Sequence, residues 1–170
     1  MNDGTVALIK GDQHARFPYG LANRVIAEVT GSPYTHVKLY FDGATHEVTT
    51  PGGYRKTEGE PSGDLFLEPV YAWNDEKKAR SRQMLECMKH DRYNYLRLVM
   101  LIIVYPTRKF WRALRWFPGC NRYIWGDVCS SFVDVWFRHG PGWDLWPDDP
   151  ESYTAPGDFT KTWGLREVSK

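Results

Sequence analysis

The clearest periodic pattern in this chain is an alternation of polar and apolar residues between positions 34 and 41. Val37, Leu39 and Phe41 are separated there by more polar residues, and this period of two predicts a half-buried β-strand. Asp42-Gly43 follows directly, and this pair favours a two-residue turn between antiparallel strands. Because the chain then returns over residues 44–50, the pattern predicts a β-hairpin.

Shorter patterns predict the remaining elements. Further strands are expected over residues 5–9, 64–70 and 165–168. Apolar residues at helical spacing predict helices over residues 21–29, 75–88, 93–105, 108–117 and 128–138. Residues 50–63 are rich in Gly, Pro, Thr and charge, which predicts a surface loop. We therefore expect one α+β domain over residues 1–170, with a small antiparallel sheet or partial barrel packed against helices.

The composition is typical of such a domain and reduces the classes of partner that we expect. Hydrophobic residues make up 42% of the 170 residues and charged residues 25%, which is typical of globular proteins. The net charge of +1 gives no basic field that would favour nucleic acid as a partner. The three cysteines lack the CxxC or Cys/His spacing of a zinc site, so we expect neither a metal nor a cofactor.

No segment of the chain predicts export or membrane insertion. The first residues lack the basic and apolar regions of a signal peptide. The longest apolar run, residues 98–105, is much shorter than the roughly 20 residues that cross a bilayer. The default expectation is therefore a cytoplasmic protein.

Cys129 stands at the predicted start of the helix over residues 128–138. Apolar residues recur at helical spacing from Val128 onward, and Asp127 before them is the expected N-cap. A cysteine in the first turn meets free backbone N–H groups and the positive end of the helix dipole, which favour a reactive thiolate. The alternative is a small apolar cysteine packed in a helix. Cys87 and Cys120 lack a helix-start setting, and we interpret both as structural.

The hairpin offers a base for such a thiol. A two-residue turn pairs Lys38 with Glu47 and His36 with Thr49, so that His36 and Glu47 project from the same face while His46 points the other way. A carboxylate near an imidazole fixes its tautomer and stabilises its charged form, as a base for a thiol requires. A register slip of one residue would exchange Glu47 for His46. The alternative is a polar sheet face without a catalytic role.

Two of these segments resemble a known family. Residues 31–43, GSPYTHVKLYFDG, with the following His46-Glu47, are similar to the "SHVGIY...G...EA" segment of the circularly permuted NlpC-type papain-like hydrolases, the YiiX-like group. Residues 127–133, DVCSSFV, resemble that group's "CSEFV" helix start, and the histidine precedes the cysteine in both. Residues 93–95 and 154–159 also match, so the resemblance covers about residues 5–168.

This resemblance implies a permuted papain-like fold with Cys129 as nucleophile, His36 as base and Glu47 as the third polar residue. Two departures concern the third residue: Ser131 replaces the usual Glu or Asp after Cys-Ser, and the interval from His36 to Glu47 is one residue short. His46 remains an alternative to Glu47, because related acyltransferases of the lecithin:retinol type carry a second histidine on the corresponding strand.

The resemblance also implies a cysteine endopeptidase or amidase that acts on peptidoglycan stem peptides. Without a signal peptide, such an enzyme would reach the cell wall as a virion component or after lysis. The alternatives are a lipid or thioester acyl hydrolase or acyltransferase, and a catalytically silent binding module in a larger assembly.

The lipid alternative is supported by the acyltransferase branch of the resemblance and by the helix predicted over residues 108–117. Its basic side begins with Arg108 and its aromatic side ends with Phe117, a distribution that could contact a membrane interface. The more ordinary interpretation is a surface helix that packs its aromatic side into the core.

Overall fold

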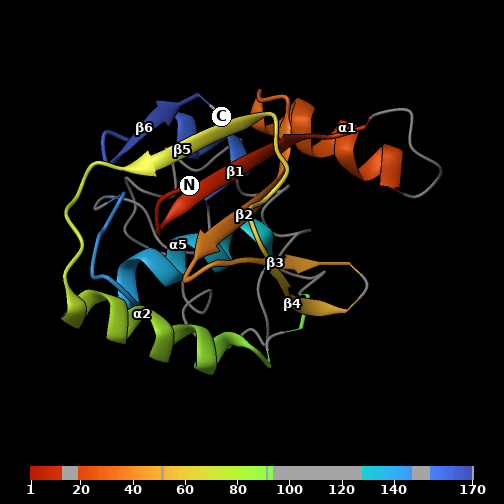
Figure 1. Cartoon of the computed structure of the whole chain (residues 1–170). Coiled ribbons are helices and arrows are strands. Elements are labelled where there is room, and N and C mark those ends of the chain that lie inside the picture. Colours follow the sequence, from red (N-terminus) through yellow and green to blue (C-terminus); the bar gives the residue numbers. More distant parts are fainter. Residues whose placement is uncertain (13–18, 51, 91, 94–127, 147–153, 170) are drawn as a thin grey trace, which may run out of the picture.

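The central element of the fold is an antiparallel sheet of six strands in the order β4-β3-β2-β1-β5-β6 (Figure 1). The computed structural model describes residues 1–12, 19–50, 52–90, 92–93, 128–146 and 154–169. The strands are β1 (Thr5–Lys10), β2 (Tyr34–Phe41), β3 (Ala44–Thr49), β4 (Gly53–Glu58), β5 (Leu65–Pro69) and β6 (Leu165–Val168). The described strands thus form an open sheet rather than a partial barrel.

Helices pack mainly on the half of the sheet that contains β2 and β3. The described helices are α1 (Tyr19–Thr30), α2 (Asp75–Met88), α5 (Cys129–His139) and the 3-10 helix η3 (Pro156–Lys161). α5 contacts both β2 and β3 and is itself covered by α2, whereas α1 and η3 contact β2 (Figure 1). The helix predicted over residues 108–117 lies outside the described residues, as does all but the start of the one predicted over residues 93–105.

The core joins the apolar face of β2 to α5. Val37, Leu39 and Phe41 are fully buried, whereas the residues between them are partly exposed, as the alternation in the sequence predicts. The ring of Phe41 meets that of Trp136 on α5 with centroids 5.1 Å apart. Each large apolar side chain buried in this way contributes roughly 1.5–3 kcal/mol to stability. Packing of this kind fixes α5, and with it Cys129, relative to the hairpin.

The prediction of a loop over residues 50–63 is wrong, because β4 lies within it. Its pairing with β3 runs from Ala44–Glu58 to Thr49–Gly53. Among the β4 residues only Gly53 is buried, so the strand lacks the alternating apolar positions by which strands are recognised in a sequence. β4 is an edge strand, and charged side chains such as Arg55 protect an edge from pairing with other chains.

Candidate active site

The hairpin turn between β2 and β3 has the backbone geometry that the sequence predicts. Asp42 and Gly43 have φ angles of 54° and 78°, and positive values at both positions define the tight turn that Asp-Gly favours. The register that follows pairs Leu39 with His46. The predicted register is therefore confirmed, and His36 and Glu47 share one face of the hairpin.

The two strands separate beyond this point. Their pairing ends at Leu39 and His46, although β2 extends back to Tyr34 and β3 continues to Thr49. The predicted ladder pair of His36 with Thr49 is therefore absent from the described sheet. In Figure 1 the strands diverge from the turn like the arms of a V, and α5, which contacts both strands, passes behind them. This divergence gives side chains near the start of α5 access to the face that carries His36 and Glu47.

His36 and Glu47 are in direct contact. His36 Nε2 lies 2.7 Å from Glu47 Oε2, and their side chains are 24% and 11% exposed. Burial by itself would raise the pKa of Glu47, but the hydrogen bond to His36 and the charges of His36, Lys38 and Arg55 outweigh it and lower that pKa. Glu47 is therefore an ionised hydrogen-bond acceptor for the imidazole.

α5 begins at Cys129, with Val128 rather than the predicted Asp127 in the N-cap position. The Ser131 hydroxyl accepts a hydrogen bond from the Val128 backbone N–H and donates one to the Val128 carbonyl, both at 3.1 Å. Ser131 thus closes the first turn from inside the helix. In the sequence, Ser131 stands out only as a departure from the family pattern. A Ser two residues beyond the first helical residue is the signal that could have identified its role at the helix start.

Cys129 is the first residue of α5 and is buried, with 8% of its surface exposed. At this position the backbone N–H groups of the first turn have no partner within the helix and point toward its N-terminal end. They can stabilise negative charge on the cysteine sulfur or on a substrate oxygen.

Cys129 is electrostatically coupled to His36. Burial lowers the pKa of His36, but the negative charge and hydrogen bond of Cys129, together with the contact to Glu47, raise it to about 9. At neutral pH the imidazole is thus held as imidazolium between a sulfur and a carboxylate. The structure therefore brings Cys129, His36 and Glu47 together, in an arrangement that can transfer a proton from thiol to imidazole.

His46 lies on the opposite face of β3 and is 4% exposed. Its Nε2 is 3.2 Å from the Phe41 carbonyl and therefore carries the proton, which leaves Nδ1 to accept from the Tyr54 hydroxyl at 2.8 Å. Burial lowers the pKa of His46. His46 is therefore bound within the hairpin and its neighbouring strand, and Glu47 is the residue that contacts His36.

The described residues do not form a metal site. Nowhere in that part of the chain do three or more His, Cys, Asp or Glu side chains lie where they could hold a metal ion, so we assign no metal ligands. None of the described helices is long and apolar enough to span a membrane.

Comparison with known proteins supports the fold. No protein-family model and no curated protein matches the sequence. The structure is similar to the crystal structure of the metalloprotein YiiX from Escherichia coli O157:H7, with a TM-score of 0.61 and 10% sequence identity. The match covers 99% of this chain and 97% of the YiiX chain. At this identity the comparison shows a fold and no activity: the chain has a YiiX-like fold.

Proposed function

We propose that this protein is a cysteine hydrolase of the circularly permuted papain-like, NlpC-type class. The observation that carries the proposal is the contact of 2.7 Å between His36 and Glu47 beside Cys129, a buried cysteine at a helix start. A nucleophile, a base and a group that orients the base are the three components that thiol hydrolysis needs. The YiiX-like fold supports the proposal because the sequence resemblance points to the same group.

The acylation step starts from the ion pair in which His36 holds the proton of the Cys129 thiol, and the Cys129 thiolate attacks an amide or ester carbonyl carbon. The backbone N–H of Cys129 stabilises the negative oxygen of the tetrahedral intermediate. The carbon–nitrogen or carbon–oxygen bond then breaks, and the His36 imidazolium gives its proton to the leaving amine or alcohol. Glu47 keeps the imidazole ring oriented throughout.

Water completes the reaction. It gives a proton to His36 while its oxygen attacks the carbonyl carbon of the acyl-enzyme. The carbon–sulfur bond breaks, the carboxylic acid product leaves, and Cys129 is released as the thiolate. The proton remains on His36, so the starting ion pair is restored.

We propose amide bonds in bacterial cell-wall peptides as the substrate, because the group that the sequence resembles acts on them. The protein would then reach the cell wall as a virion component or after lysis. The lipid alternative rests on the acyltransferase branch of the resemblance and on residues 108–117, which lie outside the described residues.

The test compares wild-type protein with Cys129→Ala on purified peptidoglycan and on vesicles of acylated phospholipid, with products identified by mass spectrometry. Release of peptide fragments by the wild type alone is the expected result. Release or transfer of fatty acyl groups would favour the lipid alternative instead.

Cys87 supplies the control for the role of Cys129. Cys87 is exposed on α2 and has no role in the proposed site, so Cys87→Ala should retain full activity. If neither substrate changes and an electrophilic probe labels Cys87 as readily as Cys129, the hydrolase proposal is wrong, and a binding module becomes the better explanation.

A further inference from the structure

We propose that Lys38 is a positioning residue that attracts the Glu47 carboxylate and thereby sets the pH range in which His36 exchanges its proton. The inference rests on the proposed thiol hydrolysis and deepens it. Lys38 has no assigned role in the mechanism above.

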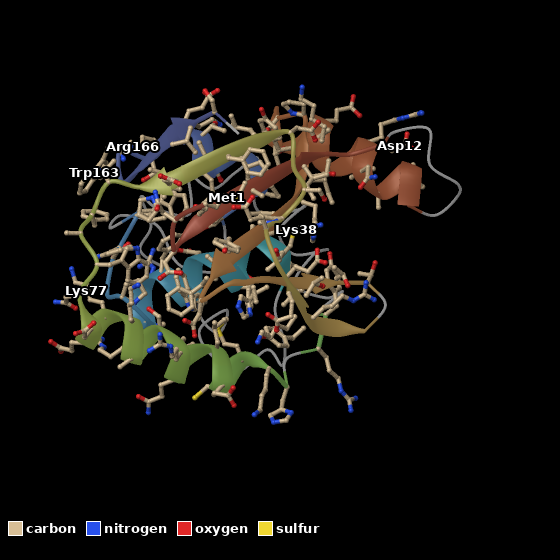
Figure 2. All side chains as sticks on the ribbon, viewed as in Figure 1. Met1, Asp12, Lys38, Lys77, Trp163 and Arg166 are labelled. Carbon is tan, nitrogen blue, oxygen red and sulfur yellow. The ribbon has the colours of Figure 1, made fainter. Side chains whose placement is uncertain are left out.

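The geometry places two cationic groups on one carboxylate oxygen. Lys38 Nζ lies 3.9 Å from Glu47 Oε2, the same oxygen that contacts His36 Nε2 at 2.7 Å. Lys38 and His36 are two residues apart on β2 and so project from the same face. Figure 2 labels Lys38 beside the point where β2 and β3 diverge.

Partial burial strengthens this ion pair. The Lys38 side chain is 19% exposed and that of Glu47 11%, so the two charges interact through less water than a pair on the open surface. A lysine in this setting keeps its ammonium near the carboxylate while its aliphatic part lies along the sheet.

The other charges around the site come from neighbouring elements. Arg55 on β4 pairs with Glu47 in the β3–β4 ladder and is exposed, and Cys129 on α5 faces His36. Arg55 acts on Glu47 through its charge alone, whereas Lys38 also forms an ion pair with it. Of these two side chains, Lys38 is therefore the one whose positive charge acts most directly on the Glu47 carboxylate.

The consequence concerns the acid step of the reaction. Because the Lys38 ammonium attracts the oxygen that holds the His36 proton, it weakens the pull of Glu47 on that proton. The imidazolium then gives its proton more readily to the leaving group. Without Lys38, Glu47 would hold the imidazolium more tightly, and His36 would lose its proton only at higher pH.

The direct test is an NMR titration of the His36 imidazole in a Cys129→Ala background, which removes the thiol. In Lys38→Met we expect the titration midpoint to rise by about half a pH unit, and in Lys38→Arg to stay near the unsubstituted value. Lys56→Met is the matched control, because Lys56 lies on β4 with its ammonium 2.9 Å from Glu58. An unchanged midpoint in Lys38→Met, or an equal rise in Lys56→Met, would overturn the proposal.

The pH profile of kcat/KM on the cleaved substrate, with Cys129 intact, separates this inference from the proposed function. If the alkaline limb moves to higher pH in Lys38→Met and keeps its wild-type position in Lys38→Arg, both the role of Lys38 and the hydrolase proposal are supported. If the wild type is active and Lys38→Met changes neither the alkaline limb nor the titration midpoint of His36, Lys38 has no role in the proton exchange. A shifted midpoint in a protein that hydrolyses nothing supports the coupling of Lys38 to His36 and contradicts the hydrolase.

Discussion

Glu47 acts on His36 through its charge as well as through its hydrogen bond. In Glu47→Gln the hydrogen bond can remain while the charge is lost, so we expect the pKa of His36 to fall from about 9. The alkaline limb of the pH profile for alkylation of Cys129 by iodoacetamide should then move to lower pH. Hydrolytic kcat/KM should fall by roughly 10- to 100-fold.

Glu58→Gln is the control for this change, because Glu58 ends β4 at an exposed position. It should leave both measurements as in the wild type. An alkylation profile of Glu47→Gln that coincides with the wild type would mean that Glu47 only orients the ring.

The protonation of His46 affects the stability of the folded protein. Burial lowers the pKa of His46 below its ordinary value of 6.5, so the unfolded chain takes up a proton at a higher pH than the folded protein does. The folded state therefore loses stability as the pH falls below about 6.5. In His46→Gln, whose amide can replace both hydrogen bonds, this loss should be absent.

Urea unfolding at pH 7.5 and 5.5 gives the free energy of unfolding of the wild type and of His46→Gln. Contributions from other titrating groups cancel in the difference between the two proteins. The stability of the wild type relative to His46→Gln should fall by up to about 1.4 kcal/mol between the two values. A constant difference for His46→Gln would contradict the assignment of a buried neutral imidazole.

At the scale of elements, the start of α5 depends on the Ser131 hydroxyl. Ser131→Ala removes both of its hydrogen bonds to Val128, and we expect a loss of about 1 kcal/mol in the free energy of unfolding. Alkylation of Cys129 should also slow, because a frayed first turn no longer holds the sulfur near His36.

Ser130 provides a matched control one residue away. Its hydroxyl is buried and has no hydrogen-bond partner among the described residues, so Ser130→Ala should be neutral or slightly stabilising. Equal losses in the two variants, measured by urea unfolding, would show that the hydroxyl of Ser131 has no special role at the helix start.

How well each element could be predicted from the sequence follows from how local its determinants are. The β2–β3 hairpin was predicted to its register because Asp42-Gly43 and the alternation beside it lie within a few residues. β4 was missed because its exposed polar residues have no periodic apolar signal, and it forms only because β3 is available to pair with it. The N-cap was misplaced because Asp127 is a stronger cap by residue type than Val128, whereas Ser131 supplies the hydrogen bonds.

At the scale of the whole molecule, the candidate site depends on contacts between distant parts of the chain. β1 lies between β2 and β5, an order that no local pattern encodes. The grouping of Cys129 with His36 and Glu47 was expected from the resemblance, and strand parity selected Glu47 over His46. The separation of β2 from β3, which opens the hairpin face toward α5, could not be predicted because it depends on packing across the sheet.

The C-terminal part of the chain supports the site through a close contact between η3 and the residues before β2. A Cβ atom at Gly157 would lie 2.2 Å from Ser32 Oγ, so Gly157→Ala must displace η3 or the start of β2, which contact each other. We expect a loss of about 2 kcal/mol in urea unfolding and slower alkylation of Cys129, because His36 lies two residues into β2. Ser32→Gly removes the obstructing side chain at the cost of the hydrogen bond from the Tyr34 N–H to Ser32 Oγ. The double variant should therefore be more stable than the sum of the two single losses predicts, and strict additivity would show that η3 and β2 are not coupled through this contact.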